Sequence, residues 1–147
     1  MGKIDRITVH HEGYRPVYFS DMASTAERLE LIRQSHLSRM RAGDIGYHYV
    51  IDRAGRLWEC RDFHYQGAHV KNNNEHNLGV MVLGNFDRQQ PTDAQIVTLR
   101  DTLSKLMRHY RVPVNRVYTH QEITPTACPG KKLQPTVVSL RTNHKLA

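Results

Sequence analysis

The sequence predicts one α/β (α+β) domain, residues 1–147, built on a central mixed β-sheet that is flanked by helices. A chain of 147 residues is long enough for a single domain with a buried core. Its 39% hydrophobic and 24% charged residues are typical of a folded globular chain. Segments with strand character alternate with segments of helical periodicity, which indicates a sheet with helices packed against it. No run approaches the roughly 18 to 20 apolar residues of a membrane span, so we expect no transmembrane segment.

The first elements expected along the chain are a strand and a helix. Residues 7–10 alternate polar and apolar side chains and include β-branched residues, which favours a strand. Ser24 and Glu27 have the spacing of a capping box that begins a helix, and Gly43 ends it. The apolar face of this helix is predicted from residues at helical spacing: Leu29, Ile32, His36 or Leu37, and Met40.

A hairpin and a buried strand are expected next. Residues 47–51 and 56–60 flank the turn residues 52–55, which predicts a β-hairpin. Residues 78–84 form a short and almost wholly apolar run, which is typical of a strand buried at the centre of a sheet.

The last part of the chain predicts a helix, a strand and a short closing helix. Thr92 and Gln95 form a second capping box. The helix that follows carries its apolar residues at helical spacing: Ile96, Leu99, Leu103, Leu106, Met107 and Tyr110. Residues 116–119 are expected to form the last strand, and residues 137–140 a short helix.

The formal charge of +7 favours an anionic partner, such as nucleic acid, an acidic lipid surface or a cell-wall polymer. Nucleic-acid binding would require a basic face with stacking aromatic side chains. Aromatic residues make up only 7% of this chain, and its Lys and Arg residues are scattered over helices and loops. We therefore do not expect nucleic acid as the primary partner.

Three residues at or after strand ends are candidates for a metal site. His10 ends the first predicted strand, His120 comes at the end of the last one, directly after residue 119, and Cys128 follows in a segment stiffened by Pro125 and Pro129. Zinc binds imidazole nitrogen and thiolate, and catalytic zinc sites use three protein ligands and one open position. Spacing alone leaves an alternative open, because a free cysteine is commonly a buried small apolar residue. Cys60 has no motif partner, and we expect it to have an ordinary packing role.

Five short motifs occur in one order along the chain: residues 7–11 (ITVHH), 46–49 (GYHY), 66–69 (QGAH), 77–80 (NLGV), and 120–122 with 127–130 (HQE and ACPG). Their order and spacing closely resemble the zinc N-acetylmuramoyl-L-alanine amidases. That superfamily includes phage lysozyme-type amidases and peptidoglycan recognition proteins. The resemblance runs from about Ile7 to Leu140, which is nearly the whole chain.

The resemblance implies a peptidoglycan recognition protein-like fold with a groove across one face and Zn²⁺ at its floor. The family's ligands fall on His10, His120 and Cys128. The family's active-site tyrosine falls on Tyr47. Thr126 stands where phage enzymes often have lysine and where recognition-protein amidases tend to have threonine. Tyr47 and Thr126 are thereby implied to hydrogen-bond the attacking water or the tetrahedral oxyanion.

Two further histidines and a glutamate have open roles. Side chains alternate along a strand, so His11 should point away from His10 and is the less favoured ligand. A structural role is favoured for His48 as well. Glu122 is a conceivable acid or base, but a salt bridge or a supporting role is favoured.

The substrate groove is implied to involve His69 and Asn74, with Arg61 and Phe63 nearby. For Asn74 the alternative is an ordinary turn, which asparagine suits. Asp62 and Phe63 stand where some relatives carry a residue pair associated with the third residue of the stem peptide. That departure leaves both diaminopimelate-type and lysine-type substrates open.

The implied function is zinc-dependent hydrolysis of the amide between N-acetylmuramic acid and L-alanine of peptidoglycan. The alternative is a non-catalytic module that binds peptidoglycan, but such relatives typically lack the cysteine that this chain has as Cys128. We expect a monomer that acts on the cell wall. The first residues lack the apolar stretch of a signal peptide, which predicts either a phage-type endolysin made in the cytoplasm or the mature domain of a secreted protein.

Overall fold

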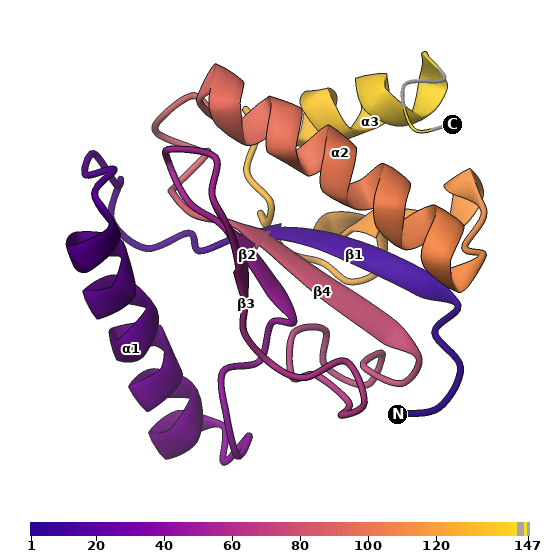
Figure 1. Ribbon diagram of the computed structural model, residues 1–147, viewed down its shortest axis with the longest axis horizontal. Coiled ribbons are helices and arrows are strands. Elements are labelled where there is room, and N and C mark those ends of the chain that lie inside the picture. The colour runs from indigo at the N-terminus through magenta and orange to yellow at the C-terminus, as the bar shows by residue number, and fades with distance from the viewer. Residues whose placement is uncertain (144–145, 147) are drawn as a thin grey trace.

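The computed structural model describes residues 1–143 and Leu146, and a five-stranded mixed sheet forms its centre (Figure 1). The strands are β1 (Arg6–His11), β2 (Tyr49–Ile51), β3 (Leu57–Glu59), β4 (Asn77–Val82) and β5 (Val117–Thr119). Their order across the sheet is β3-β2-β4-β1-β5. β2, β4, β1 and β5 run parallel, whereas β3 pairs with β2 in the antiparallel hairpin that the sequence predicts. The predicted single domain with a mixed sheet is confirmed in its architecture.

Helices cover both faces of the sheet, with α1 (Met22–Arg39) on one side and α2 (Asp93–Tyr110) and α3 (Gln134–Thr142) on the other (Figure 1). Short 3₁₀ turns at Val114–Arg116 and His120–Glu122 flank β5. Strand alternation divides the apolar side chains of the sheet between two cores. The core under α2 and α3 includes Ile7, Val9, Leu78, Val80, Leu99, Leu103 and Val137. The core under α1 includes Leu29, Ile32, Val50, Met81 and Leu83.

The central position of the buried strand and the capping box at Thr92 are confirmed. β4 lies at the centre of the sheet with all six residues buried, because helices cover the sheet on both of its faces. Thr92 caps α2 through its side chain, which accepts from the backbone N–H of Gln95, and the Gln95 side chain accepts from the N–H of Thr92. This is the reciprocal capping box that the sequence predicts.

The predicted boundaries of α1 are wrong at both ends. The helix begins at Met22 because Asp21 is its N-cap, and Oδ2 of Asp21 accepts from the backbone N–H of Ser24 at 2.8 Å. Aspartate is among the strongest N-cap residues, so it starts the helix before the proposed box at Ser24. The helix ends at Arg39, before Gly43, and Met40 is 50% exposed and not part of the buried face.

Other elements also differ in length from their predictions: β1 is longer than the expected residues 7–10, and β2, β3 and β4 are shorter than the expected residues 47–51, 56–60 and 78–84. α3 is longer than the predicted residues 137–140, since it starts at Gln134 with a proline in its first turn, where the missing N–H costs nothing. β5 starts one residue later than predicted, because Arg116 belongs to the preceding 3₁₀ turn. Within the described residues, none of the helices has the length and apolar character that crossing a membrane requires.

Candidate metal centre

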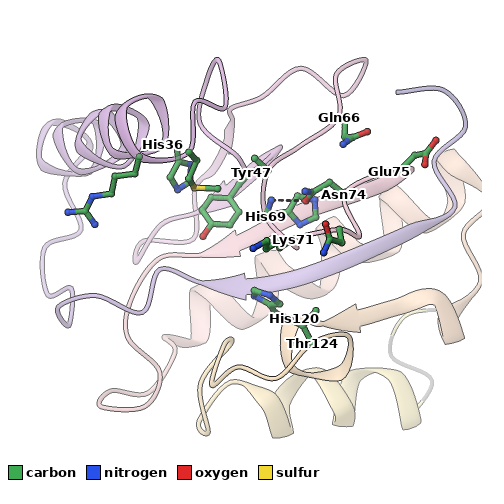
Figure 2. Close-up of a pocket in the computed structure, with 13 residues that line it drawn as sticks. His36, Tyr47, Gln66, His69, Lys71, Asn74, Glu75, His120 and Thr124 are labelled. Carbon is green, nitrogen blue, oxygen red and sulfur yellow. Dashed lines mark hydrogen bonds between the residues drawn. The ribbon is translucent and has the colours of Figure 1, made fainter.

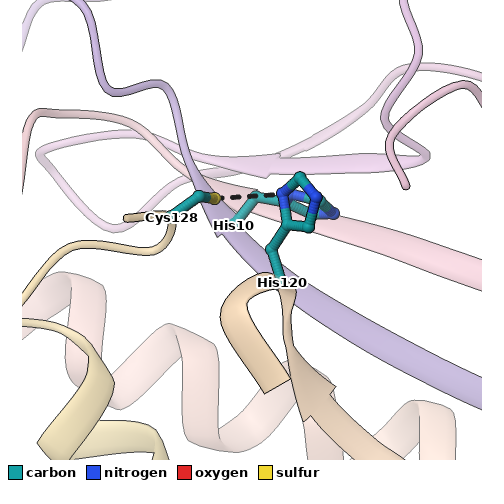
Figure 3. A group of neighbouring side chains, drawn as sticks. All are labelled: His10, His120 and Cys128. Carbon is teal, nitrogen blue, oxygen red and sulfur yellow. Dashed lines mark hydrogen bonds between the residues drawn. The ribbon is translucent and has the colours of Figure 1, made fainter. Parts of the chain in front are cut away.

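Three side chains converge where β1 and β5 end. His10 lies near the carboxyl end of β1, His120 directly follows β5, and Cys128 lies on the loop beyond it (Figure 3). One ligand atom from each residue lies within 4.8 Å of the other two. Nδ1 of His10 is 3.5 Å from Sγ of Cys128. β1 and β5 are parallel neighbours, so their carboxyl ends lie at the same edge of the sheet and bring these distant residues together.

The donor set of this cluster fits zinc. Two imidazole nitrogens and one thiolate are ligands that zinc prefers, and three protein ligands leave a fourth position for a water or a substrate atom. Burial, followed by the neighbouring His69, His120 and His11, lowers the pKa of His10, and burial lowers the pKa of His120. Both rings are therefore neutral at pH 7 and can offer a lone pair.

The thiol of Cys128 is the ligand that most needs a cation. Burial raises its pKa to about 12, so without metal the sulfur carries its proton at neutral pH. A cation beside the sulfur favours the thiolate, because metal binding and loss of the thiol proton are coupled. The chemistry of the three donors thus suits a divalent metal better than it suits a free thiolate nucleophile.

The ring nitrogens of His11 and His48 form hydrogen bonds with backbone groups outside the candidate metal cluster. The ring of His11 stacks on Phe86, and its Nδ1 accepts the backbone N–H of Phe86 at 3.1 Å. His48 accepts the N–H of Gly79 through Nδ1, and its Nε2 lies 2.9 Å from the carbonyl oxygen of Tyr65. Strand alternation places His11 in the core under α2 and α3, whereas His10 faces the α1 side.

Tyr47 lies beside the cluster. Its ring centroid is 5.2 Å from that of His10 and 5.6 Å from that of His36. Burial, with smaller contributions from Cys128 and Glu12, raises the pKa of Tyr47, so its hydroxyl keeps its proton and remains a hydrogen-bond donor. Thr126 is exposed, and its Oγ1 accepts the N–H of Cys128 at 3.3 Å.

A hollow of about 1140 Å³ opens next to the cluster (Figure 2). Four residues expected in the site line it: Tyr47, His69, Asn74 and His120. Asn74 also has the turn role that the sequence left open, because its Oδ1 accepts the backbone N–H groups of His69 and Val70.

Arg61 and Phe63 are not among the described residues that line this hollow. The Arg61 guanidinium donates to the backbone carbonyls of Ala42, Asp44, Ile45 and Gln66, and so holds the loop that precedes β2 to the one that follows β3. Phe63 packs against the rings of His64 and Tyr110. Contact of Arg61 and Phe63 with substrate stays a prediction.

The hollow includes residues that the sequence reasoning missed. His36, predicted only as part of an apolar helix face, turns its ring to Tyr47, and its Nδ1 accepts the N–H of Gly46 at 2.7 Å. Lys71 and Glu75 line the hollow from the loop before β4. His36 had a usable signal, a histidine on an otherwise apolar helix face, whereas the two charged loop residues belong to no motif.

Glu122 forms the salt bridge that the sequence favoured. Its carboxylate pairs with the Arg141 guanidinium at 2.6 Å and accepts the N–H of Thr119 at 2.8 Å. Burial alone would raise the pKa of Glu122, but Arg141 and the Thr119 N–H hold it below its ordinary value. Cys60 is a half-buried free thiol whose pKa burial raises to about 12, which fits an inert packing role.

Comparison with known proteins adds a family match. The family model described as N-acetylmuramoyl-L-alanine amidase matches residues 1–131. The N-acetylmuramoyl-L-alanine amidase of Homo sapiens is 31% identical over 131 residues, which cover 85% of this chain and 22% of that protein. The endolysin of Escherichia phage T7 is 35% identical over 96 residues, 62% of each chain.

A similar solved structure is a mutant of Drosophila PGRP-LB in complex with tracheal cytotoxin. It superposes with a TM-score of 0.85 at 19% identity and covers 95% of this chain and 82% of that one. At this identity the likeness concerns the fold. The chain thus spans about a fifth of the human relative, 62% of the endolysin and most of the solved domain.

Proposed function

Because the chain belongs to the N-acetylmuramoyl-L-alanine amidase family, we propose that it is a zinc-dependent enzyme that hydrolyses the amide between N-acetylmuramic acid and L-alanine of peptidoglycan. The observation that carries the proposal is the convergence of His10, His120 and Cys128, with ligand atoms within 4.8 Å of one another, at the edge of a wide hollow. His10, His120 and Cys128 would hold the metal. When bound, zinc supplies a water of lowered pKa, toward about 7, and a Lewis acid that polarises a carbonyl.

Two hydroxyl groups are assigned to the substrate's reacting amide. Tyr47 keeps its proton, so its hydroxyl can donate to the oxygen of the scissile carbonyl as negative charge develops there. Oγ1 of Thr126 accepts the Cys128 N–H, which leaves the threonine O–H free to donate to another group. A neutral hydroxyl cannot supply the positive charge of a lysine at this position, so we expect Thr126 to contribute orientation more than electrostatic stabilisation.

The hollow is the proposed binding site of the muropeptide. Its lining carries hydrogen-bonding side chains and opposite charges at Lys71 and Glu75, which suits a substrate with amide, carboxylate and ammonium groups. The formal charge of +7 favours approach to an anionic cell wall. We assign the activity to a monomer acting on the wall, either as a phage-type endolysin or as the mature domain of a secreted protein.

The alternative is a module that binds peptidoglycan without cutting it. Structural relatives include recognition proteins, and one of them was solved with tracheal cytotoxin. We favour the enzyme because Cys128 and Tyr47 are both present and both lie next to His10.

The test is digestion of purified peptidoglycan by the zinc-loaded chain, followed by mass spectrometry of the products. The expected products are stem peptides with a free N-terminal L-alanine and glycan strands that have lost their peptides. The Cys128→Ser and His120→Ala variants should release none, while His48→Leu, altered outside the cluster, should retain cleavage. Sacculi of the diaminopimelate and lysine types, tested in parallel, distinguish the two stem preferences. Binding without release of peptides by the zinc-loaded native chain would establish the alternative.

A further inference from the structure

His69 lies directly behind the candidate metal ligand His10, in a slot made by two glycines. Its side chain is buried, with 8% of the residue exposed. A Cβ placed on Gly67 would lie 2.6 Å from Cδ2 of His69, and one on Gly79 would lie 2.8 Å from Cγ and Cδ2. Real Cβ atoms essentially never approach so closely, so only glycine at both positions leaves room for this ring. The ring of His69 is thereby held in one place.

The hydrogen bonds of His69 determine where its proton lies. Nε2 of His69 is 2.9 Å from the carbonyl oxygen of Asn77, and a carbonyl can only accept. Nε2 therefore carries the proton of the neutral ring, and Nδ1 is left with a lone pair. This Nδ1 lies 2.9 Å from Nε2 of His10, so Nε2–H of His10 donates to it.

The hydrogen bond to His69 also determines the tautomer of His10. With its proton on Nε2, the neutral ring of His10 has its lone pair on Nδ1. Nδ1 is the atom that lies 3.5 Å from Sγ of Cys128, in the cluster with His120 (Figure 3). A chain of two hydrogen bonds thus runs from the Asn77 carbonyl through His69 to His10 and ends at a lone pair that faces the candidate metal position.

We propose that His69 is a positioning residue that fixes the tautomer and the ring orientation of His10 and so presents Nδ1 of His10 to the metal. This proposal rests on the zinc site of the proposed function. Metal-binding histidines generally donate their second ring N–H to an oriented acceptor, and loss of that acceptor typically costs 10- to 100-fold in metal affinity. The role differs from the substrate contact expected from sequence, because both ring nitrogens of His69 are already engaged within the protein.

His48 provides a matched control. It is also a buried histidine with both ring nitrogens engaged, and its ring lies 5.9 Å from that of His69. Its partners are Gly79 and Tyr65, whereas the partner of His69 Nδ1 is His10. Replacing His48 should therefore disturb packing without altering the ligand.

The first measurement needs no substitution. Long-range ¹H–¹⁵N spectra of the histidine rings in the native chain should show the proton on Nε2 of both His10 and His69, with and without zinc. A His10 ring that carries its proton on Nδ1 in the metal-free chain would overturn the proposal.

The second measurement is zinc affinity, by competition with a chromophoric chelator, for two variants of matched shape. His69→Leu removes the acceptor and should lower the affinity 10- to 100-fold. His69→Asn places an amide oxygen where Nδ1 was and should restore most of that loss. His48→Leu should bind zinc as the native chain does. The absorption bands of the Co²⁺-substituted His69→Leu variant should be shifted from those of the Co²⁺-substituted native chain. Those of His69→Asn should lie at the native positions.

The outcomes separate the two proposals. Native affinity in a folded His69→Leu variant would overturn the positioning role alone. Absence of zinc binding by the native chain would overturn the proposed function, and the metal part of this inference with it. Should His69→Leu fail to fold, the ring spectra of the native chain and the affinity of His69→Asn still decide the question.

Discussion

Nδ1 of His10 lies 3.5 Å from Sγ of Cys128, although 118 positions separate the two residues along the chain. Backbone contacts fix the loop that carries the sulfur. The N–H of Gln121 donates to the carbonyl of Cys128 at 2.9 Å, and Gly130 packs against the backbone of Phe86. The geometry of the candidate metal centre therefore depends on how closely this loop approaches the segment that follows β4.

Substitution at Gly130 should affect both stability and metal binding. Gly130 has a φ of +94°, and a Cβ there would lie 2.6 Å from the carbonyl carbon of Phe86 and 2.9 Å from the nitrogen of Asp87. We expect Gly130→Ala to cost more than the roughly 1 to 3 kcal/mol of backbone strain, because the loop must also move away from Phe86. Zinc affinity should fall with it. Urea unfolding and chelator competition measure the two effects.

Gly43→Ala is the control for Gly130→Ala. Gly43 also has a positive φ, +79°, but a Cβ there meets no described atom within 4 Å. Gly43→Ala should lose only the stability that backbone strain costs, and it should bind zinc with the affinity of the native chain. Equal losses of stability in the two variants would argue against close approach as the reason for glycine at position 130.

Removing the Tyr47 hydroxyl should slow catalysis without weakening zinc binding. The hydroxyl keeps its proton because burial raises its pKa, and loss of one donor to a developing oxyanion often costs about 10²- to 10³-fold in rate. Tyr47→Phe should therefore release stem peptides at a rate lower by that factor. Zinc affinity from chelator competition should match the native chain. A native rate would remove Tyr47 from the proposed mechanism.

The carboxylate of Asp52 should be among the strongest determinants of stability. It is fully buried and accepts the N–H groups of Ala54 and Arg56, the Arg56 guanidinium and the indole N–H of Trp58. Asp52→Ala would leave the backbone N–H groups and the indole N–H without their acceptor, and an unsatisfied buried donor typically costs about 1 to 3 kcal/mol, whereas the Arg56 side chain is 39% exposed and can be solvated. Asp52→Asn keeps one acceptor oxygen, so its free energy of unfolding should lie between that of the native chain and that of Asp52→Ala.

Trp58 is the sole tryptophan of the sequence, so its fluorescence reports urea unfolding of the Asp52 variants. Asp101→Ala, on an exposed part of α2, is the control and should stay within about 0.5 kcal/mol of the native chain. A comparably small effect of Asp52→Ala would contradict the assignment of this network.

The Glu122–Arg141 pair should make stability depend on pH. Burial raises the pKa of Glu122, but Arg141 and the Thr119 N–H outweigh it and hold the folded pKa below the unfolded value of 4.5. A depressed carboxyl pKa stabilises the fold above the unfolded pKa, and that contribution is lost as the pH falls through the folded pKa. The stability difference between the native chain and Arg141→Gln should thus be largest at pH 7 and should shrink below about pH 4.5.

Part of the stability difference between the native chain and Arg141→Gln should persist below pH 4.5, since Arg141 also donates to the carbonyl of Val117. Arg100→Gln breaks an exposed pair with Asp101 and is the control, with little effect expected at either pH. Chemical unfolding at a series of pH values measures both variants. A difference that does not change with pH would show that the ion pair contributes nothing to it.

Local signals in the sequence predicted most of the fold. The capping box at Thr92, the apolar run that became β4 and the turn between β2 and β3 each depend on residues close together in the chain. α1 shows the limit of such signals, because two candidate caps lie three residues apart and Asp21 forms the cap where Ser24 was expected. Strand alternation was enough to separate His10 from His11, since adjacent side chains of a strand point to opposite faces.

The site was predictable only in part. Motif order pointed to His10, His120 and Cys128, and the parallel pairing of β1 with β5 brings their ligand atoms together. Gly67, His69 and Gly79 belong to two of the five motifs, but the position of His69 behind His10 could not be read from them, because it depends on both glycines meeting one ring from two different segments.

The sequence by itself therefore determined which elements form, which faces they bury and which residue types are available for metal chemistry. The tertiary structure decided which of the 10 histidines face one another, which nitrogen of His10 is left free, and that Arg61 supports a loop and does not line the hollow. The physical reason is the separation along the chain over which each interaction acts. Capping, turn formation and periodicity act over a few residues, whereas a hydrogen bond such as that between His10 and His69 requires two segments, 59 positions apart, to be placed within tenths of an ångström.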